Sequence, residues 1–278
     1  MARIVFVLVL TVLVSGCASK VEKARTAMEK GDFEKAVSLY RKALEEKGLK
    51  SAEAADMHYN VGRSLEKMGR AEEAVEEYRL SIELKPDNLK VYMAMADALD
   101  KIGLIEQEVL VLRNALILDP KNPHAESMLG EAYAKLGQYV NAKQEFEKAI
   151  RHNPRDPSSY VSLGLVHDRL GDTENAIIAW EEALNLRADD EAALLNLGYV
   201  YNRMNRYADA VRVYSKLVGV KPGVAKYHNN LGIAYYNDSQ FDEALKEFET
   251  VLSIDQNFPG AQDFARLAKR AASKGRKG

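Results

Sequence analysis

One spacing recurs through most of this sequence and limits the folds open to it. Residues that favour turns stand 34 positions apart in six successive segments: Gly69, Gly103, Gly137, Gly171, Asn205 and Ser239. Prolines keep the same spacing at Pro86, Pro120, Pro154 and, after one omission, Pro222. A fixed period of this length is typical of one small structural unit repeated many times. Such units stack in a row and bury their apolar faces against one another.

Each unit has the apolar pattern of two helices. In the sixth unit, small and apolar residues at the helical spacings i, i+3, i+4 and i+7 are Leu194, Leu197, Gly198 and Tyr201. A second stripe follows, made of Ala210, Tyr214 and Leu217. The glycine and the alanine are small enough to let the two helices approach closely. The turn residues of the 34-residue series stand where a helix ends with positive φ, so each unit is predicted to be a helical hairpin.

The residues at these fixed places resemble the tetratricopeptide repeat (TPR), whose pattern is W-x2-L-G-x2-Y…A-x3-F…P. The fourth unit matches most clearly, at Leu129, Gly130, Tyr133, Ala142, Phe146 and Pro154. We count seven units, of which the first is a half-match. The resemblance implies an all-α superhelical solenoid of seven helix-turn-helix repeats over residues 17–258. Residues 259–278 are expected to add a C-terminal capping helix and a basic tail.

The N-terminus has the features of an export signal. A short positive start, Met1-Ala2-Arg3, precedes an apolar run from Ile4 to Val14 that is too short to span a membrane as a helix. We therefore expect residues 1–16 to be a signal peptide. The alternative is a plain secretory signal followed by an incidental cysteine.

The segment Val14-Ser15-Gly16-Cys17 resembles the lipobox of bacterial lipoproteins. The resemblance implies cleavage before Cys17 and attachment of palmitate and other acyl chains to it, and several chains together give a stable membrane anchor. Ala18 and Ser19 follow, and neither is the aspartate that retains many lipoproteins in the inner membrane. The expected location is the outer membrane, on its periplasmic side.

Residues that could carry chemistry are scarce. Cys17 is the only cysteine, and no two of the five histidines lie at the helical spacings typical of a zinc pair. No glycine-rich phosphate loop or nucleophile elbow is present. The net charge of −2 disfavours a nucleic-acid partner. We therefore expect no enzyme activity, no catalytic residue, no metal and no cofactor.

The resemblance to TPR proteins also indicates a binding face, because one face of each first helix lines a concave groove in that family. We place a partner site on this face in units five to seven, at Leu165, Asn196, Tyr199, Asn230 and Tyr236. Tyrosine is enriched in binding hot spots, and asparagines one repeat apart could satisfy the backbone of an extended ligand. The alternative is that the two asparagines only stabilise loops or the neighbouring helix.

The third unit departs from the pattern. Glu108 stands at the alanine place of the repeat, and Ala96 stands at its glycine place. A carboxylate at this position must either turn outward or lose its water, and both weaken packing. We expect this unit to be a soft joint between the N-terminal and C-terminal halves.

The function that these features favour is that of a lipid-anchored scaffold for protein–protein interactions in the envelope. The chain looks like the TPR lipoproteins that help type IV pilus secretins to assemble, which are pilotin-type proteins. The alternative is an adaptor for a periplasmic protease or for peptidoglycan enzymes. An enzyme with a cryptic site is the remaining alternative from another class.

Overall fold

The computed structural model describes residues 19–46 and 48–275 of the chain, and this part is helical throughout, with no strand. Helical residues 19–29 come first. The following helices are α2 (Phe33–Leu44), α3 (Ser51–Lys67), α4 (Ala71–Leu84), α5 (Leu89–Lys101), α6 (Ile105–Leu118), α7 (Pro123–Lys135), α8 (Tyr139–His152), α9 (Pro157–Arg169), α10 (Thr173–Leu186), α11 (Glu191–Arg203), α12 (Tyr207–Val220), α13 (Ala225–Asn237), α14 (Phe241–Ile254) and α15 (Ala261–Gly275).

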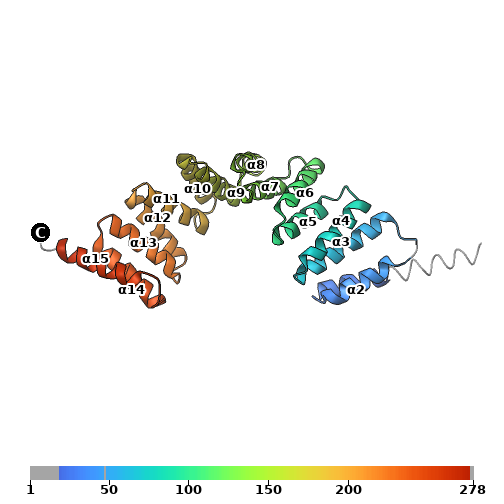
Figure 1. The fold of residues 1–278 in the computed structure, drawn as a ribbon, viewed down its shortest axis with the longest axis horizontal. Coiled ribbons are helices and arrows are strands. Elements are labelled where there is room, and N and C mark those ends of the chain that lie inside the picture. Colours follow the sequence, from blue (N-terminus) through green and yellow to red (C-terminus); the bar gives the residue numbers. More distant parts are fainter. Residues whose placement is uncertain (1–18, 47, 276–278) are drawn as a thin grey trace, which may run out of the picture. The chain divides into compact units, whose positions relative to one another are not determined.

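The helices pack as hairpins in sequence order, each first helix against its second helix, and within each of the two units described next every hairpin packs against the following one (Figure 1). The chain divides into two compact units, which we call unit 1 (Met1–His152) and unit 2 (Asn153–Gly278). The described part of unit 1 runs from residue 19 through α8, and unit 2 contains α9 to α15. The all-α solenoid predicted from the repeats is confirmed, and it is built from two such units.

The turn between the two helices of a hairpin follows one pattern. Gly137 has a φ of +72°, and the next residue, Gln138, donates its backbone N–H to the carbonyl of Tyr133 at 2.8 Å. This arrangement satisfies carbonyls that would otherwise be left open at the helix end. Asn205 and Ser239 take the same left-handed conformation, with φ of +58° and +63°. The positive φ predicted for this series is confirmed.

The third hairpin is built differently, as the sequence predicts. Glu108 is only 2% exposed, so its carboxylate is desolvated and does not turn outward. Its Oε2 atom has no hydrogen-bond partner in the part of the chain that the structure describes. Burial, reinforced by the negative charge of Asp100, raises the pKa of Glu108 to about 7, although Lys135 opposes the shift.

The last helix covers the seventh hairpin. Ala261 and Ala268 of α15 are fully buried, and the ring of Phe264 stacks on that of Phe248 with centroids 5.4 Å apart. This contact closes the apolar end of unit 2. The expected signal peptide and Cys17 lie outside the described residues. Within the described ranges no helix is both long enough and apolar enough to cross a membrane.

Candidate functional site

A groove in unit 2 opens along the two neighbouring first helices α11 and α13. Its volume is about 630 Å³, within the range of about 300–1,000 Å³ usual for binding pockets. Four asparagines, two tyrosines, two cations and two aliphatic side chains line it: Asn196, Asn202, Asn230, Asn237, Tyr199, Tyr214, Arg203, Lys226, Leu195 and Ile233. We call this the amide groove.

Three of the five residues predicted for a partner site meet in the amide groove. Asn196 and Tyr199 come from α11, and Asn230 occupies the equivalent place one repeat later on α13. Leu165, which is 41% exposed on α9, does not line the groove. Tyr236 does not line it either, because its ring packs edge-on against Phe241 with centroids 5.3 Å apart.

The side-chain amides of Asn196 and Asn230 are available to a ligand. Neither makes a hydrogen bond to any other residue that the structure describes. Asn60, which holds the same place in the second hairpin, instead donates to the carbonyl of Asp56 at 2.7 Å. An asparagine offers both a donor and an acceptor, so the pair in the amide groove can bind the N–H and C=O groups of a second chain.

The amide groove carries positive charge, and no carboxylate lines it. Arg203 forms a hydrogen-bonded ion pair with Asp168 and lies 5.8 Å from the centre of the Tyr199 ring. Lys226 makes no ion pair within the described ranges. Tyr199 is 59% exposed, which leaves one face of a large ring open to a partner.

Tyr214 is a groove residue that the sequence did not reveal. Its place in the repeat predicts a packing role, and the ring is indeed buried against α11. A Cβ at Gly198 would lie 2.5 Å from Tyr214 Cζ, so the ring passes over this glycine and brings its hydroxyl end to the groove. Burial raises the pKa of Tyr214, and the hydroxyl stays protonated as a hydrogen-bond donor. The sequence signal that could have revealed this residue is the combination of a glycine, Gly198, with a tyrosine in place of phenylalanine at position 214.

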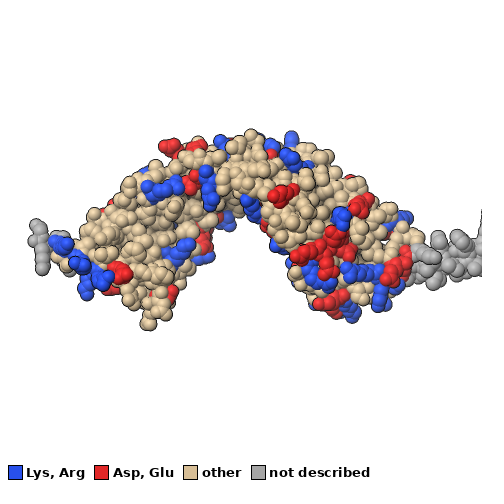
Figure 2. All heavy atoms as spheres, in the orientation of Figure 1, with Lys and Arg blue, Asp and Glu red and all other residues tan. Residues whose placement is uncertain are grey.

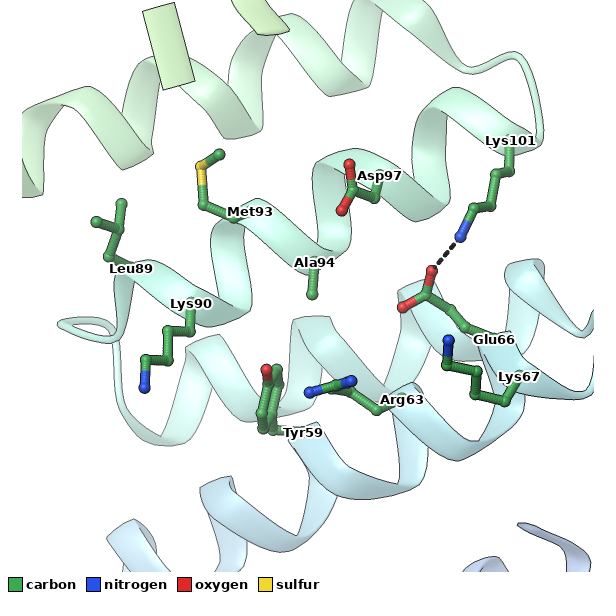
Figure 3. A pocket seen from close by; sticks show the side chains of 10 residues that line it. All are labelled: Tyr59, Arg63, Glu66, Lys67, Leu89, Lys90, Met93, Ala94, Asp97 and Lys101. Carbon is green, nitrogen blue, oxygen red and sulfur yellow. Dashed lines mark hydrogen bonds and ion pairs between the residues drawn. The ribbon is translucent and has the colours of Figure 1, made fainter. Parts of the chain in front are cut away.

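A second groove lies in unit 1, between α3 and α5 (Figure 3), and its volume is about 460 Å³. Its lining is mostly charged, with Tyr59, Arg63, Glu66, Lys67, Leu89, Lys90, Met93, Ala94, Asp97 and Lys101. We call it the charged groove. Lys101 Nζ lies 2.7 Å from Glu66 Oε1, and the Arg63 guanidinium lies 6.0 Å from the centre of the Tyr59 ring.

Four of the five histidines, His58, His152, His167 and His228, form separate pairs with carboxylates. His58 contacts Glu77 at 2.7 Å, and His228 contacts Glu247 at 2.6 Å while its other ring nitrogen lies 2.9 Å from the carbonyl of Pro222. The pairs of His58 and His228 join the two helices of a hairpin, and His228 also contacts the loop that precedes its own hairpin. Across residues 19–46 and 48–275 no three His, Cys, Asp or Glu side chains are grouped as a metal site would require.

Comparison with known proteins supports the repeat assignment over most of the chain. A sequence profile described as tetratricopeptide repeat matches residues 21–88 and 127–193, and two others with that description match residues 192–220 and 225–258. No curated protein matches the chain.

Several solved structures share the fold. The C-terminal part of a TPR repeat-containing protein from Cytophaga hutchinsonii is 18% identical, with a TM-score of 0.72 over 88% of this chain and 98% of that one. The pilF protein of Pseudomonas aeruginosa is 18% identical, with a TM-score of 0.64 over 78% of this chain and 99% of that one. YrrB, described as a TPR protein with an unusual peptide-binding site, is 23% identical, with a TM-score of 0.57 over 70% and 99%. The chain belongs to the tetratricopeptide repeat family, whose fold is that of a protein–protein interaction scaffold.

Proposed function

We propose that the protein is an envelope scaffold that binds an extended segment of another protein in the amide groove. The observation that carries this proposal is the pair Asn196 and Asn230, which stand one repeat apart with their side-chain amides unused. An extended peptide exposes backbone N–H and C=O groups that such amides can pair. The alternative is that these asparagines only stabilise loops, and we favour the binding role because neither side chain makes a hydrogen bond to another described residue.

The remaining groove residues suit the same kind of ligand. Tyr199 offers an exposed ring for an apolar side chain, and Leu195 and Ile233 add apolar surface beside it. Lys226 favours a ligand that is neutral or negatively charged at that end. The bound segment is therefore an extended one with at least one apolar anchor and no excess of positive charge.

The proposed cellular setting rests on the N-terminal sequence. Acylation of Cys17 would hold the solenoid at the outer membrane, facing the periplasm. Within that setting we favour a role in the assembly of type IV pilus secretins, and the fold shared with pilF agrees with it. Delivery of substrates to a periplasmic protease or to peptidoglycan enzymes is the second candidate. We propose no catalytic activity, because the sequence offers no nucleophile elbow, no zinc-pair spacing of histidines and no phosphate loop.

Site-specific crosslinking tests the groove directly. A photoreactive amino acid at position 199, on the amide groove, is compared with one at Glu182, an exposed residue of α10. We expect position 199 to crosslink one defined envelope protein, with the attachment point in an extended segment of that protein. Asn196→Ala/Asn230→Ala should abolish this product, whereas the matched exposed pair Glu174→Ala/Glu182→Ala should retain it. A product that forms equally from position 182, or that survives the asparagine double substitution, would show that the amide groove is not the partner site.

A further inference from the structure

The charged groove of unit 1 continues into a second cavity. The neighbouring cavity, of about 390 Å³, shares Tyr59 and Lys90 with the charged groove. Six cations line the two cavities together, namely Arg25, Arg63, Lys67, Lys85, Lys90 and Lys101. Four carboxylates line them, namely Asp56, Glu66, Asp87 and Asp97. This surface is locally positive although the chain carries a net charge of −2.

Three of the cations have no carboxylate partner. Arg63, Lys67 and Lys90 make no ion pair with any residue in the described ranges, and all three are exposed. Figure 3 shows Tyr59 with Arg63 on one side and Lys90 on the other, while Ala94 opposite them presents only a methyl group. The small side chain of Ala94 leaves the ring and both cations open to the groove.

The two carboxylates of the charged groove, Glu66 and Asp97, present little free negative charge to a ligand. Glu66 accepts hydrogen bonds from Lys101 and from the hydroxyl of Tyr78. Burial raises the pKa of Asp97, and the neighbouring charge of Glu66 raises it further, although His124 and Lys101 oppose the shift. The unbalanced charge that a ligand would meet is therefore positive. Figure 2 shows charged side chains of both signs gathered over α2 and α3.

From this geometry we infer that the charged groove is a second interaction surface, which binds an extended acidic segment of a partner protein. Carboxylates of the segment lie beside Arg63, Lys67 and Lys90, and an apolar or aromatic side chain packs on Tyr59. Charge complementarity of this kind selects the partner and speeds its association. The inference does not depend on the amide groove, which lies in the other unit and recognises backbone amides.

A peptide fits this surface better than other anionic partners do. A nucleic acid presents a continuous row of phosphates, which Asp56 and Asp87 would repel. A membrane surface is broad, whereas these cations line cavities between helices. A peptide can place its carboxylates beside the cations and neutral residues beside the acids.

The test uses the full chain and a dye-labelled peptide of twelve residues with four Asp or Glu, one Phe, and Ser or Gly elsewhere. Its control has Asn or Gln at the four acidic positions. Fluorescence anisotropy should show that the acidic peptide binds at least ten-fold more tightly than the amide control at low salt. The acidic peptide should lose most of this advantage in 300 mM NaCl, because salt screens exposed charges.

Variants locate the binding. Arg63→Glu/Lys90→Glu should weaken binding of the acidic peptide at least ten-fold. Lys35→Glu/Lys42→Glu on α2 makes the same change in net charge at exposed residues outside the charged groove and should leave binding within two-fold. A loss of acidic-peptide binding in Asn196→Ala/Asn230→Ala would assign the peptide to the amide groove and overturn the inference. Circular dichroism checks that each variant folds.

Several results would overturn the inference. The two charge-reversal variants could bind the acidic peptide equally, or the amide peptide could bind as tightly as the acidic one. Polyphosphate, or vesicles of phosphatidylcholine with 30% phosphatidylglycerol, could bind through Arg63 and Lys90 more tightly than the peptide does. Each of these outcomes would show that the cations of the charged groove bind another kind of partner or none.

Discussion

Trp180 lies directly over Gly164, and a Cβ at position 164 would stand 2.4 Å from the indole Nε1. The indole N–H donates to the carbonyl of Val161 at 3.1 Å, one turn earlier on α9. Four other hairpins repeat this contact, with the pairs Gly62–Tyr78, Gly130–Phe146, Gly198–Tyr214 and Gly232–Phe248. The aromatic ring fills the space that the glycine leaves, so this pair sets the distance between the two helices of a hairpin.

Gly164→Ala should therefore destabilise the protein by about 1–3 kcal/mol, because a buried ring must move to admit one methyl group. Trp180 is the only tryptophan, so its fluorescence reports the displacement as well as the unfolding. Gly219→Ala is the matched control, because Gly219 lies in α12 with nothing within 4 Å of the added Cβ. That variant should be neutral or stabilised by about 0.5–1 kcal/mol. Equal stability of the two variants would contradict the role given to the Gly164–Trp180 contact.

In the third hairpin, both positions of the glycine–aromatic pair hold other residues. Ala96 replaces the glycine and Leu112 replaces the aromatic, and both are fully buried. We expect Leu112→Phe alone to destabilise by about 1–3 kcal/mol, since Ala96 leaves no room for the ring. Adding Ala96→Gly should recover part of this loss, with a coupling of at least about 0.5 kcal/mol in a double-mutant cycle. Strictly additive effects in urea unfolding would show that the two places do not compensate each other.

The repeat pattern predicted the fold nearly completely. Residues that recur in each repeat, such as Gly130 and Phe146, determine how the two helices of a hairpin pack. Hairpins that must bury their remaining apolar faces against their neighbours can then form few folds other than a solenoid. The division after His152 was not predicted, because the 34-residue spacing runs through it without interruption. For the Glu108 carboxylate, the sequence left two alternatives, namely that it turns outward to water or that it is buried. Sequence alone could not choose between them, since the choice depends on how tightly neighbouring helices enclose the carboxylate.

Ser239 is the least suited of the turn residues to its backbone conformation, which has a φ of +63°. An L residue with a Cβ is strained there, so Ser239→Gly should stabilise the protein by up to about 1 kcal/mol. Asn205→Gly should gain less, because asparagine tolerates this region and its Oδ1 accepts a hydrogen bond from Tyr207 at 2.6 Å. Thermal unfolding of the two variants side by side measures the difference. A larger gain at position 205 would contradict this ranking.

The amide groove was only partly predictable. Asn196, Tyr199 and Asn230 could be placed on one face from the repeat register, because equivalent positions on successive first helices face the same way. Leu165 and Tyr236 share that register but do not line the amide groove. Whether a side chain lines a groove depends on its neighbours, and the contact of Tyr236 with Phe241 could not be read from the register.

Cys17 is the residue on which the proposed anchor depends. Cys17→Ser removes the thiol that would carry the acyl chains, so the variant should leave the outer-membrane fraction and appear as soluble periplasmic protein. Metabolic labelling with a clickable palmitate analogue should mark the wild type and not the variant. Ser15→Ala, a small-residue change beside the expected cleavage site, should keep both the label and the membrane fraction. Unchanged sedimentation of Cys17→Ser with that membrane would refute the anchor.

Glu108 should make stability fall as the pH rises. Its pKa is about 7 in the folded protein, against an ordinary value of 4.5, so between these values the folded state holds the proton more tightly than the unfolded chain does. The free energy of unfolding therefore decreases across this window, by up to about 3 kcal/mol once the pH exceeds the folded pKa. The groups that face Glu108 are Asp97 and Asp100 of α5 and Glu131 and Lys135 of α7.

Glu108→Gln keeps the shape of the side chain and removes its ionisation. Relative to the wild type, this variant should gain up to about 3 kcal/mol between pH 4 and pH 8, whereas Glu106→Gln, at an exposed position of α6, should show no such trend. Glu108→Ala, which restores the residue usual at this place, should also stabilise at pH 8. Amide exchange should locate the effect, with α5 and α6 opening more readily than α7 and α8 at pH 8 and this difference shrinking in Glu108→Gln. A pH-independent difference in stability between Glu108→Gln and the wild type would contradict the prediction that ionisation of Glu108 weakens this hairpin and makes it a soft joint.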